Sequence, residues 1–587
     1  MLSYHYLLPS LLRTASSPFR CCMRCVASIT QPEVTPSESS LPNGSSEDSV
    51  KDLPQSEPAS VRSNFRAMQQ LRHDQAHESL LVQAPSVESA FVVEKECLKF
   101  GTVQSMFHYR QNEKDYFLIH MNSKSAVRSM LDACVHPSRD GIVPVRSRLL
   151  EASTLQRRSS AATISPLIPE QSITAMQLDK DLLQQNGVSA QMQYLYKSCK
   201  IPELGTRLRY FISSQIEEAV SGLFPHCRVY LFGSSVSGFG QHHSDVDMIL
   251  DFDQVFTEKR PGTANFRFVS KPSAGNDRVQ CQRSLELLAD NLQYLLPGYT
   301  QIQRILLARV PIVKFLHEPS GVRCDLSTTN MSGLVMSNYL YTLGEIDERL
   351  RALVVTIRRW ANANRLTNAH PGRWITNFTL TILVVFFMQH KKLLPPLSQL
   401  PSTPLINRRS LDGPNDDLGQ LLAEFFSFYA SFNYKSHAIS VIDGTIYPKP
   451  DFASLYIENP LETELNIARN LSAEELDRVV NSMRTATWIL EGAGKDPLLP
   501  GIVRLFQEIN EKDVPRPKKM GVSVDELFRK SGAAHKYQPD EFAVDNTVKN
   551  FSLKSNINTT TPQEKHALRN SRQKFIREKQ KPLGTRW

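Results

Sequence analysis

Two aspartates separated by one residue stand at the start of an apolar run. Asp245 and Asp247 flank Val246, and the run continues to residue 250. Alternate side chains of a strand point to the same face, so this spacing directs both carboxylates toward one point. Carboxylates this close repel each other unless a cation lies between them, and hard oxygen ligands are those that Mg²⁺ prefers. The pair therefore predicts a metal site.

A small turn and a third acid belong to the same pattern. Residues 229–232 form a short apolar run that predicts a strand, and Gly233 and Ser234 follow it directly. A turn led by glycine exposes backbone N–H groups that can bind phosphate oxygens. Asp325 lies in another predicted strand, residues 322–326, which returns from a hairpin turn. The three acids and the turn outline a phosphoryl-transfer site.

The length and charge of the chain set the frame for this site. A chain of 587 residues is too long for one hydrophobic core, so two or three domains with linkers are expected. The formal charge of +9 is concentrated at the ends, with +3 in residues 1–32 and +6 in residues 561–587. The body between them has no net charge, so nucleic-acid contacts there require local basic patches.

The N-terminal residues have the composition of a targeting segment. Residues 1–40 contain Arg, Ser and Leu and no acid before Glu33, which predicts a mitochondrial transit peptide and the mitochondrial matrix as location. A merely disordered terminus is the alternative. Residues 41–77 are predicted to be a disordered linker because the stretch is rich in Ser, Pro and Glu.

Cysteines and apolar runs exclude other classes. Cys22 and Cys25 form one CxxC without a second pair, which supports neither a zinc site nor a disulfide framework. The longest apolar run, residues 380–388, is too short to span a bilayer. We therefore expect no membrane partner and interpret this run as a buried helix.

Residues 78–151 predict a separate small module. The predicted order is strand, helix, strand, strand, helix and strand, which is the split arrangement of an RNA-recognition-like (βαββαβ) fold. The K/R-G-F/Y-G-F signature of RNA-binding versions is absent, although aromatic residues are available on the central strands. We expect the module to pack against a partner chain. The strands are expected at 79–82, 103–109, 116–121 and 142–145, and the helices at 87–100 and 126–135.

The remaining elements predict an α+β fold with a small α/β catalytic domain at 200–335 and a helical domain at 336–512. An amphipathic helix is expected at 204–220, and Ser472 with Glu475 forms a capping box at the start of another helix. Residues 513–587 are expected to be a basic, flexible tail that contacts phosphate. Long helices after Asp325 are predicted at 340–361, 377–390, 418–430 and 472–490.

These motifs resemble the DNA polymerase β-like nucleotidyltransferases, in particular the non-canonical poly(A) and poly(U) polymerases. The resemblance covers about residues 207–490. It implies a nucleotidyltransferase palm domain followed by a helical poly(A) polymerase-associated domain. The motifs that carry it are FGSS at 232–235, DVDMIL at 245–250, CDLSTTN at 324–330, the helix with Asp347, Arg351 and Trp360, ITNFTL at 375–380 and IENPLETELNIARN at 457–470.

The resemblance implies a two-metal reaction. Asp245 and Asp247 would hold two Mg²⁺ (or Mn²⁺) ions, and Asp325 would join one of them and orient the RNA 3′-hydroxyl. One ion would activate this hydroxyl and the other would stabilise the charge of the triphosphate and leaving pyrophosphate. Ser234 beside Gly233 would contact phosphate.

It also implies the contacts to the nucleotide. Phe378 would stack on the incoming base, Asn377 would reach the phosphates and Arg358 would supply a cation for them. A core aromatic is the alternative for Phe378. Uridylyl-transferring relatives carry a histidine where this chain has Leu465, and an apolar side chain cannot make that hydrogen bond, so ATP is favoured. Relatives often use an asparagine for the ribose, and the residues identified near that position are Met336 and Ser337.

The expected function is therefore template-independent addition of adenylate from ATP to RNA 3′ ends. In relatives an N-terminal module is linked to dimerisation, so a homodimer is expected here. A terminal uridylyltransferase is the alternative enzyme. A catalytically silent RNA-binding scaffold is the alternative of another class, and the presence of all three carboxylates argues against it.

Overall fold

The computed structural model describes residues 61–137, 141–152, 168–169, 175–252, 269, 275–368, 370, 372–402, 409–411, 417–492 and 501–507. The predicted transit peptide, Cys22 with Cys25, and the basic tail lie outside the described residues. None of the described helices is long and apolar enough to cross a membrane.

The N-terminal module is a sheet with two helices, in the predicted order of elements. The strands are arranged β4-β1-β3-β2-β5, with β1 antiparallel to β3 and parallel to β4. One face of the sheet packs on the two helices of the module. The elements are β1 (Ser79–Ala84), α2 (Ala90–Cys97), β2 (Val103–Gln111), β3 (Lys114–Met121), α3 (Lys124–Ala133), β4 (Leu149–Glu151) and β5 (Ile168–Pro169).

The last strand of this module was predicted at the wrong place. Residues 142–145 form no strand, and Val143 is 60% exposed. Leu149 and Leu150 instead pack against the apolar clusters on the two faces of the sheet. Burial against the core, rather than β propensity alone, decides which apolar residues pair with β1.

The linker prediction for 41–77 is also wrong in its second half, because helix α1 (Val61–His77) occupies it. Phe65 and Ala76 are buried in the core of the catalytic domain. The Gln69 side-chain amide donates to the backbone C=O of Leu231 at 2.9 Å. The composition of residues 41–77, taken as a whole, does not indicate this helix. Helix α1 is stabilised by the packing of its apolar residues on the catalytic domain.

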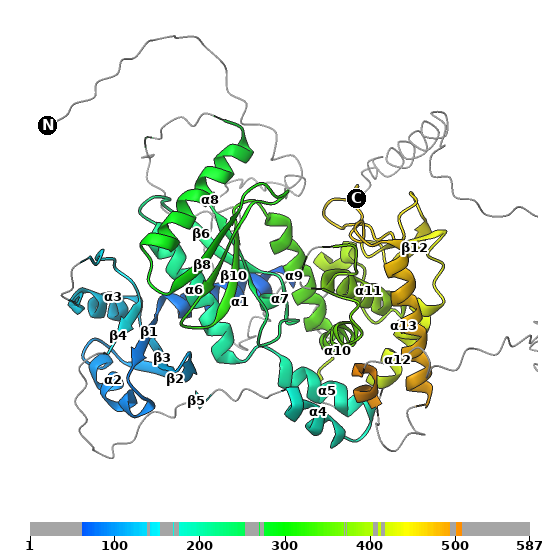
Figure 1. Cartoon of the computed structure of the whole chain (residues 1–587), viewed down its shortest axis with the longest axis horizontal. Coiled ribbons are helices and arrows are strands. Elements are labelled where there is room, and N and C mark those ends of the chain that lie inside the picture. The colour runs from blue at the N-terminus through cyan, green and yellow to red at the C-terminus, as the bar shows by residue number, and fades with distance from the viewer. Residues whose placement is uncertain are drawn as a thin grey trace, which may run out of the picture. The chain divides into compact units, whose positions relative to one another are not determined.

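The catalytic domain contains a five-stranded sheet in the order β6-β7-β10-β9-β8 (Figure 1). Strands β7 and β10 are parallel, whereas all other neighbours are antiparallel. Helices α6 and α8 contribute apolar residues to its core. The elements are α6 (Glu203–Val220), β6 (Arg228–Phe232), α7 (Ser234–Ser237), β7 (Val246–Asp251), α8 (Asp277–Tyr294), β8 (Tyr299–Ile305), β9 (Ile312–His317) and β10 (Val322–Ser327).

The helical domain is assembled from two separate parts of the chain. Two helices that precede the catalytic domain contribute Leu182, Met192 and Leu195 to the same core as the helices that follow it. The helices are α4 (Ala175–Leu183), α5 (Gly187–Cys199), α9 (Met331–Ile346), α10 (Arg349–Ala363), α11 (Asn377–His390), α12 (Leu418–Ala430) and α13 (Ala473–Gly492), and a hairpin is formed by β11 (His437–Ser440) and β12 (Thr445–Pro448).

The helix predicted at 340–361 is in fact two helices, α9 and α10. Helix α9 ends just before Asp347. The Asp347 carboxylate accepts from the backbone N–H of Arg349 at 3.0 Å and also forms an ion pair with the Arg349 guanidinium. Arg349 is 1% exposed and also pairs with Asp417. The helices predicted at 377–390 and 418–430 are confirmed, and Ser472 Oγ accepts from Glu475 N at the start of α13.

Replacing Arg349 with methionine leaves the Asp347 carboxylate buried without its cation. We expect a loss of about 3–5 kcal/mol of stability, seen as a lower urea midpoint for the helical domain. Arg478→Met removes an exposed pair with Glu475 and is the control, with an expected loss of about 0–1 kcal/mol. Equal losses in the two variants would contradict the structural role of Arg349.

Candidate active site

Two of the three aspartates lie on neighbouring interior strands of the catalytic sheet, and the third comes just before one of these strands. Asp247 on β7 is directly opposite Phe232 on β6 and Asp325 on β10. Asp245 comes immediately before β7 begins. Residues paired across adjacent strands share a face of the sheet, so the Asp247 and Asp325 carboxylates are neighbours. The structure thus brings together the three acids predicted from sequence.

Their charges affect one another. Burial and, after it, the negative charges of Asp325 and Asp245 together raise the pKa of Asp247 to about 7. The pKa of Asp245 is raised as well, first by burial and then by Asp325. Carboxylates that are costly to ionise side by side form a site where a cation is strongly favoured.

Lys314 is part of this site and was not predicted. It lies opposite Asp325 in the β9–β10 hairpin, and its ammonium group is 2.5 Å from Asp325 Oδ2. This ion pair fixes the position of the third carboxylate. The register of the hairpin pairs Val322 with His317, so three residues further along each strand it pairs Asp325 with Lys314. The sequence of the hairpin was therefore enough to predict this neighbour.

The Gly233–Ser234 turn lies against the acids. Gly233 has φ +73°, and a Cβ there would collide with Asp247 Oδ2. Its N–H donates to Ser337 Oγ at 2.7 Å, so it is already bonded to α9. Ser235 Oγ donates to the Asp245 C=O at 3.0 Å. The glycine is needed for this close approach, and the following turn is fastened to the loop that carries Asp245.

The residue after Ser337 was overlooked in the sequence. Met336 and Ser337 are both buried, and Ser337 uses its hydroxyl within the protein. Asn338 follows them on α9, and its side-chain oxygen is buried without a hydrogen-bond partner among the described residues. An unpaired buried amide oxygen is uncommon, so Asn338 is the better candidate for a ligand contact.

A buried arginine supports the loop before Asp245. Arg209 on α6 is 2% exposed, and its guanidinium donates to the C=O groups of His242 and Ser244 at 3.1 and 2.8 Å. His243 is exposed, as expected for a loop residue. The signal for Arg209 was a charged residue within the apolar part of a predicted amphipathic helix.

Two further predicted residues, Arg358 on α10 and Asn377 on α11, are linked through Thr381. Arg358 donates to Phe239 C=O at 3.2 Å and to Thr381 Oγ1 at 2.6 Å, and Thr381 Oγ1 donates to Asn377 C=O at 2.8 Å. Burial lowers the pKa of Arg358 to about 10. Arg358 lies over the Phe239 ring and forms no ion pair with a carboxylate among the described residues, so its charge is available to an anion.

Phe378 does not belong to the core. It is 39% exposed at the start of α11, whereas the residues that follow it from Thr379 to Gln389 are buried. The core interpretation considered for this aromatic is therefore wrong. Asn377 beside it is exposed. An exposed ring at a helix start is available for stacking.

Leu465 lies in a separate, well-braced loop. Its N–H donates to Glu462 C=O and its C=O accepts from Asn459 N–H. Glu462 pairs with Arg309 of the catalytic domain at 2.6 Å, which links the two domains at this point. Leu465 is half-buried and offers no side-chain hydrogen bond.

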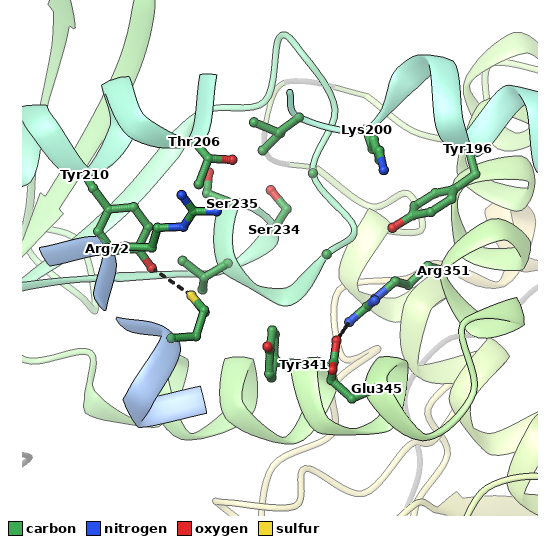
Figure 2. A pocket seen from close by; sticks show the side chains of 15 residues that line it. Arg72, Tyr196, Lys200, Thr206, Tyr210, Ser234, Ser235, Tyr341, Glu345 and Arg351 are labelled. Carbon is green, nitrogen blue, oxygen red and sulfur yellow. Dashed lines mark hydrogen bonds and ion pairs between the residues drawn. The ribbon is translucent and has the colours of Figure 1, made fainter. Parts of the chain in front are cut away.

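A pocket of about 230 Å³ lies beside α7 (Figure 2). Ser234 lines it, and it is the only one of the nine predicted site residues to do so. Arg72 and Lys200 also line it, and Arg351 is paired there with Glu345 at 2.7 Å. None of the three aspartates lines the pocket, although Ser235, which does, donates to the Asp245 C=O.

Comparison with known families supports one assignment for these domains. Residues 188–345 match the model described as "Poly(A) RNA polymerase, mitochondrial-like, central palm domain". Residues 417–468 match the model "Cid1 family poly A polymerase". The two matches fall on the catalytic sheet with its flanking helices and on the helical domain.

Whole-chain relatives agree with these matches. The chain is 35% identical to the mitochondrial poly(A) RNA polymerase of Drosophila melanogaster, over 85% of this chain and 90% of the relative. It is 33% identical to that of Homo sapiens, over 74% and 78%. The crystal structure of mtPAP in complex with UTP superimposes with a TM-score of 0.68 at 31% identity, covering 76% of this chain and all of that one. The chain belongs to the family of mitochondrial poly(A) RNA polymerases.

Proposed function

We propose that this chain adds adenylate from ATP to the 3′ ends of mitochondrial RNAs without a template. The observation that carries the proposal is the pairing of Asp247 with Asp325 on neighbouring strands, with Asp245 just before β7 and the Gly233–Ser234 turn against Asp247. This arrangement suits nucleotidyl transfer because the reaction depends on positioning and on neutralising phosphate charge.

The donor set fits two Mg²⁺ or Mn²⁺ ions. All three side chains offer hard carboxylate oxygens, and burial together with the charges of Asp325 and Asp245 raises the pKa of Asp247, which a cation would offset. Asp245 and Asp247 would hold both ions, and Asp325 would share one. When bound, the ions supply charge stabilisation for the triphosphate and acidify the RNA hydroxyl.

The other side chains have roles that follow from their positions. Asp325, held by Lys314, would orient the RNA 3′-hydroxyl. Arg358 would bind phosphate oxygens, because it is desolvated and has no acidic partner among the described residues. Ser234 and Asn377 would contribute hydrogen bonds to the phosphates, and Phe378 would stack on the base. Asn338, which follows the Met336 and Ser337 noted near that position, is the candidate for the ribose contact.

We assign the N-terminal module as RNA-recognition-like on its strand order, β4-β1-β3-β2, and its βαββαβ succession. Its aromatic face is not open for RNA, since Tyr109 and Tyr116 are buried and Tyr109 donates to Pro319 C=O. That face packs on α6 of the same chain. A homodimer formed through this module would therefore use another surface, where Leu98 on the module is 54% exposed.

ATP is favoured over UTP because Leu465 cannot donate a hydrogen bond to a base. Crystal structures of mtPAP contain ATPγS, UTP, GTP or CTP, so binding alone does not separate the nucleotides in that protein. Incorporation must be measured instead. The proposed location is the mitochondrial matrix, with residues 1–40 as the transit peptide.

Replacing Asp245, Asp247 or Asp325 with asparagine should abolish RNA extension, by at least about 10³-fold, while the fold is kept. Each change removes a ligand charge and adds no bulk. Primer extension measures the loss of activity, and circular dichroism checks that the fold is kept. Asp290→Asn, on the surface of α8, is the matched control and should keep full activity. Full extension by Asp325→Asn would place the active site elsewhere.

The Mg²⁺ requirement should rise as the pH falls. The pKa of Asp247 is raised to about 7, so protons compete with the cation below pH 7 and do not compete above it. The free Mg²⁺ concentration for half-maximal extension should increase about tenfold per pH unit between pH 7 and pH 6, and stay nearly constant from pH 7.5 to 8.5. A flat profile across pH 6–7 would contradict this electrostatic description.

Leu465→His should shift incorporation toward UTP. A new base hydrogen bond contributes about 1 kcal/mol, so the ratio of kcat/KM for UTP over ATP should rise about fivefold to tenfold. Phe378→Ala is the companion variant, because loss of stacking should lower kcat/KM for both nucleotides and leave their ratio unchanged. If the UTP/ATP ratio of kcat/KM changed in Phe378→Ala and not in Leu465→His, Phe378 rather than Leu465 would select the base.

A further inference from the structure

A second cluster of ligand-type side chains lies where α1 packs on α6. His73 and His77 are four residues apart and therefore share one face of α1. Glu217 reaches them from α6. Among the described residues, this is the one group of three or more potential ligands whose donor atoms all lie within 4.8 Å of one another.

The distances match those around a tetrahedral cation. His73 Nε2 is 3.1 Å from Glu217 Oε1, His77 Nε2 is 3.3 Å from the same oxygen, and the two Nε2 atoms are 3.1 Å apart. Zinc bonds of about 2.0–2.1 Å place tetrahedral ligands about 3.3 Å from each other. A cation could thus enter with shifts of a few tenths of an ångström.

Hydrogen bonds alone satisfy this cluster poorly. A neutral imidazole has one N–H, and here two Nε2 atoms face each other and the same carboxylate oxygen. If both carry a proton, two donors oppose each other at 3.1 Å. If only one does, a lone pair faces the carboxylate. A shared cation removes both conflicts, because every donor atom then directs a lone pair at it.

The surroundings hold these ligands in place. Glu217 Oε2 accepts from the N–H of Val229 on β6 at 2.9 Å, which fixes the carboxylate. Asp74 lies 3.9 Å from His73 Nδ1, the nitrogen that points away from the cluster, and this buried nitrogen has no hydrogen-bond partner among the described residues. Arg228 adds positive charge near His73, but its guanidinium is bonded to Gln70 at 2.8 Å.

We propose that His73, His77 and Glu217 bind one Zn²⁺-type cation that fastens helix α1 to the catalytic domain. Two imidazoles and one carboxylate favour Zn²⁺ over Mg²⁺, so this site is chemically distinct from the aspartates. The cation would join α1, α6 and, through Glu217 and Val229, strand β6, which leads to the Gly233 turn. Its role is structural, since metal binding by preformed ligands adds directly to folding stability.

Metal content of the full chain tests the proposal. The protein is purified without a polyhistidine tag and dialysed against a weak chelator, and its zinc is counted by mass spectrometry. We expect one Zn²⁺ per chain in the wild type and in Asp247→Asn, and almost none in His73→Asn/His77→Asn. His120→Asn, which removes a histidine–glutamate pair with Glu78 in the N-terminal module, is the control and should keep its zinc.

Stability and spectroscopy provide the second measurement, which does not depend on the folding of a variant. Removing metal from the wild type with EDTA should lower its unfolding midpoint, and Zn²⁺ but not Mg²⁺ should restore it. Co²⁺ added to the metal-free wild type should give the visible absorption of tetrahedral coordination. A zinc-free wild type that shows no Co²⁺ absorption would overturn the proposal, as would zinc that is lost only in Asp247→Asn.

Discussion

The negative charges of three carboxylates oppose one another at this site, and named contacts hold each of them in position. Parallel pairing of β7 with β10 places Asp247 beside Asp325. Lys314 on the neighbouring strand forms an ion pair with Asp325. Arg209 on α6 donates to the Ser244 C=O in the loop before Asp245. Because the repulsion is electrostatic, it is also the source of the site's affinity for cations.

The helical domain carries the residues proposed to contact the phosphates and the base, Arg358 and Phe378. Arg358 and the start of α11 are linked through Thr381, so the phosphate and base contacts are expected to act as one unit. The Arg349–Asp347 pair sets the turn between α9 and α10, and α10 in turn carries Arg358. Helices α4 and α5 complete this core although they precede the catalytic domain in the chain.

Local patterns in the sequence were sufficient to find the acids. The period of two along a strand predicted the Asp245–Asp247 pair, and a hairpin turn placed Asp325, because both are properties of short segments. Elements that depend on distant packing were missed. Helix α1 is stabilised by the catalytic core, and Lys314 and Arg209 act only through residues that the fold brings beside them. The break at Asp347 was missed because an ion pair, rather than a proline or glycine, ends the helix.

We propose that these acids and the Leu465 loop form a site for adenylyl transfer to RNA. The most direct measurement is extension of an RNA primer by the chain without residues 1–40, with Mg²⁺ and each of the four nucleoside triphosphates in turn. We expect long products with ATP and much shorter ones with UTP, GTP and CTP. Long products with UTP, or no extension with any nucleotide by the folded protein, would contradict it.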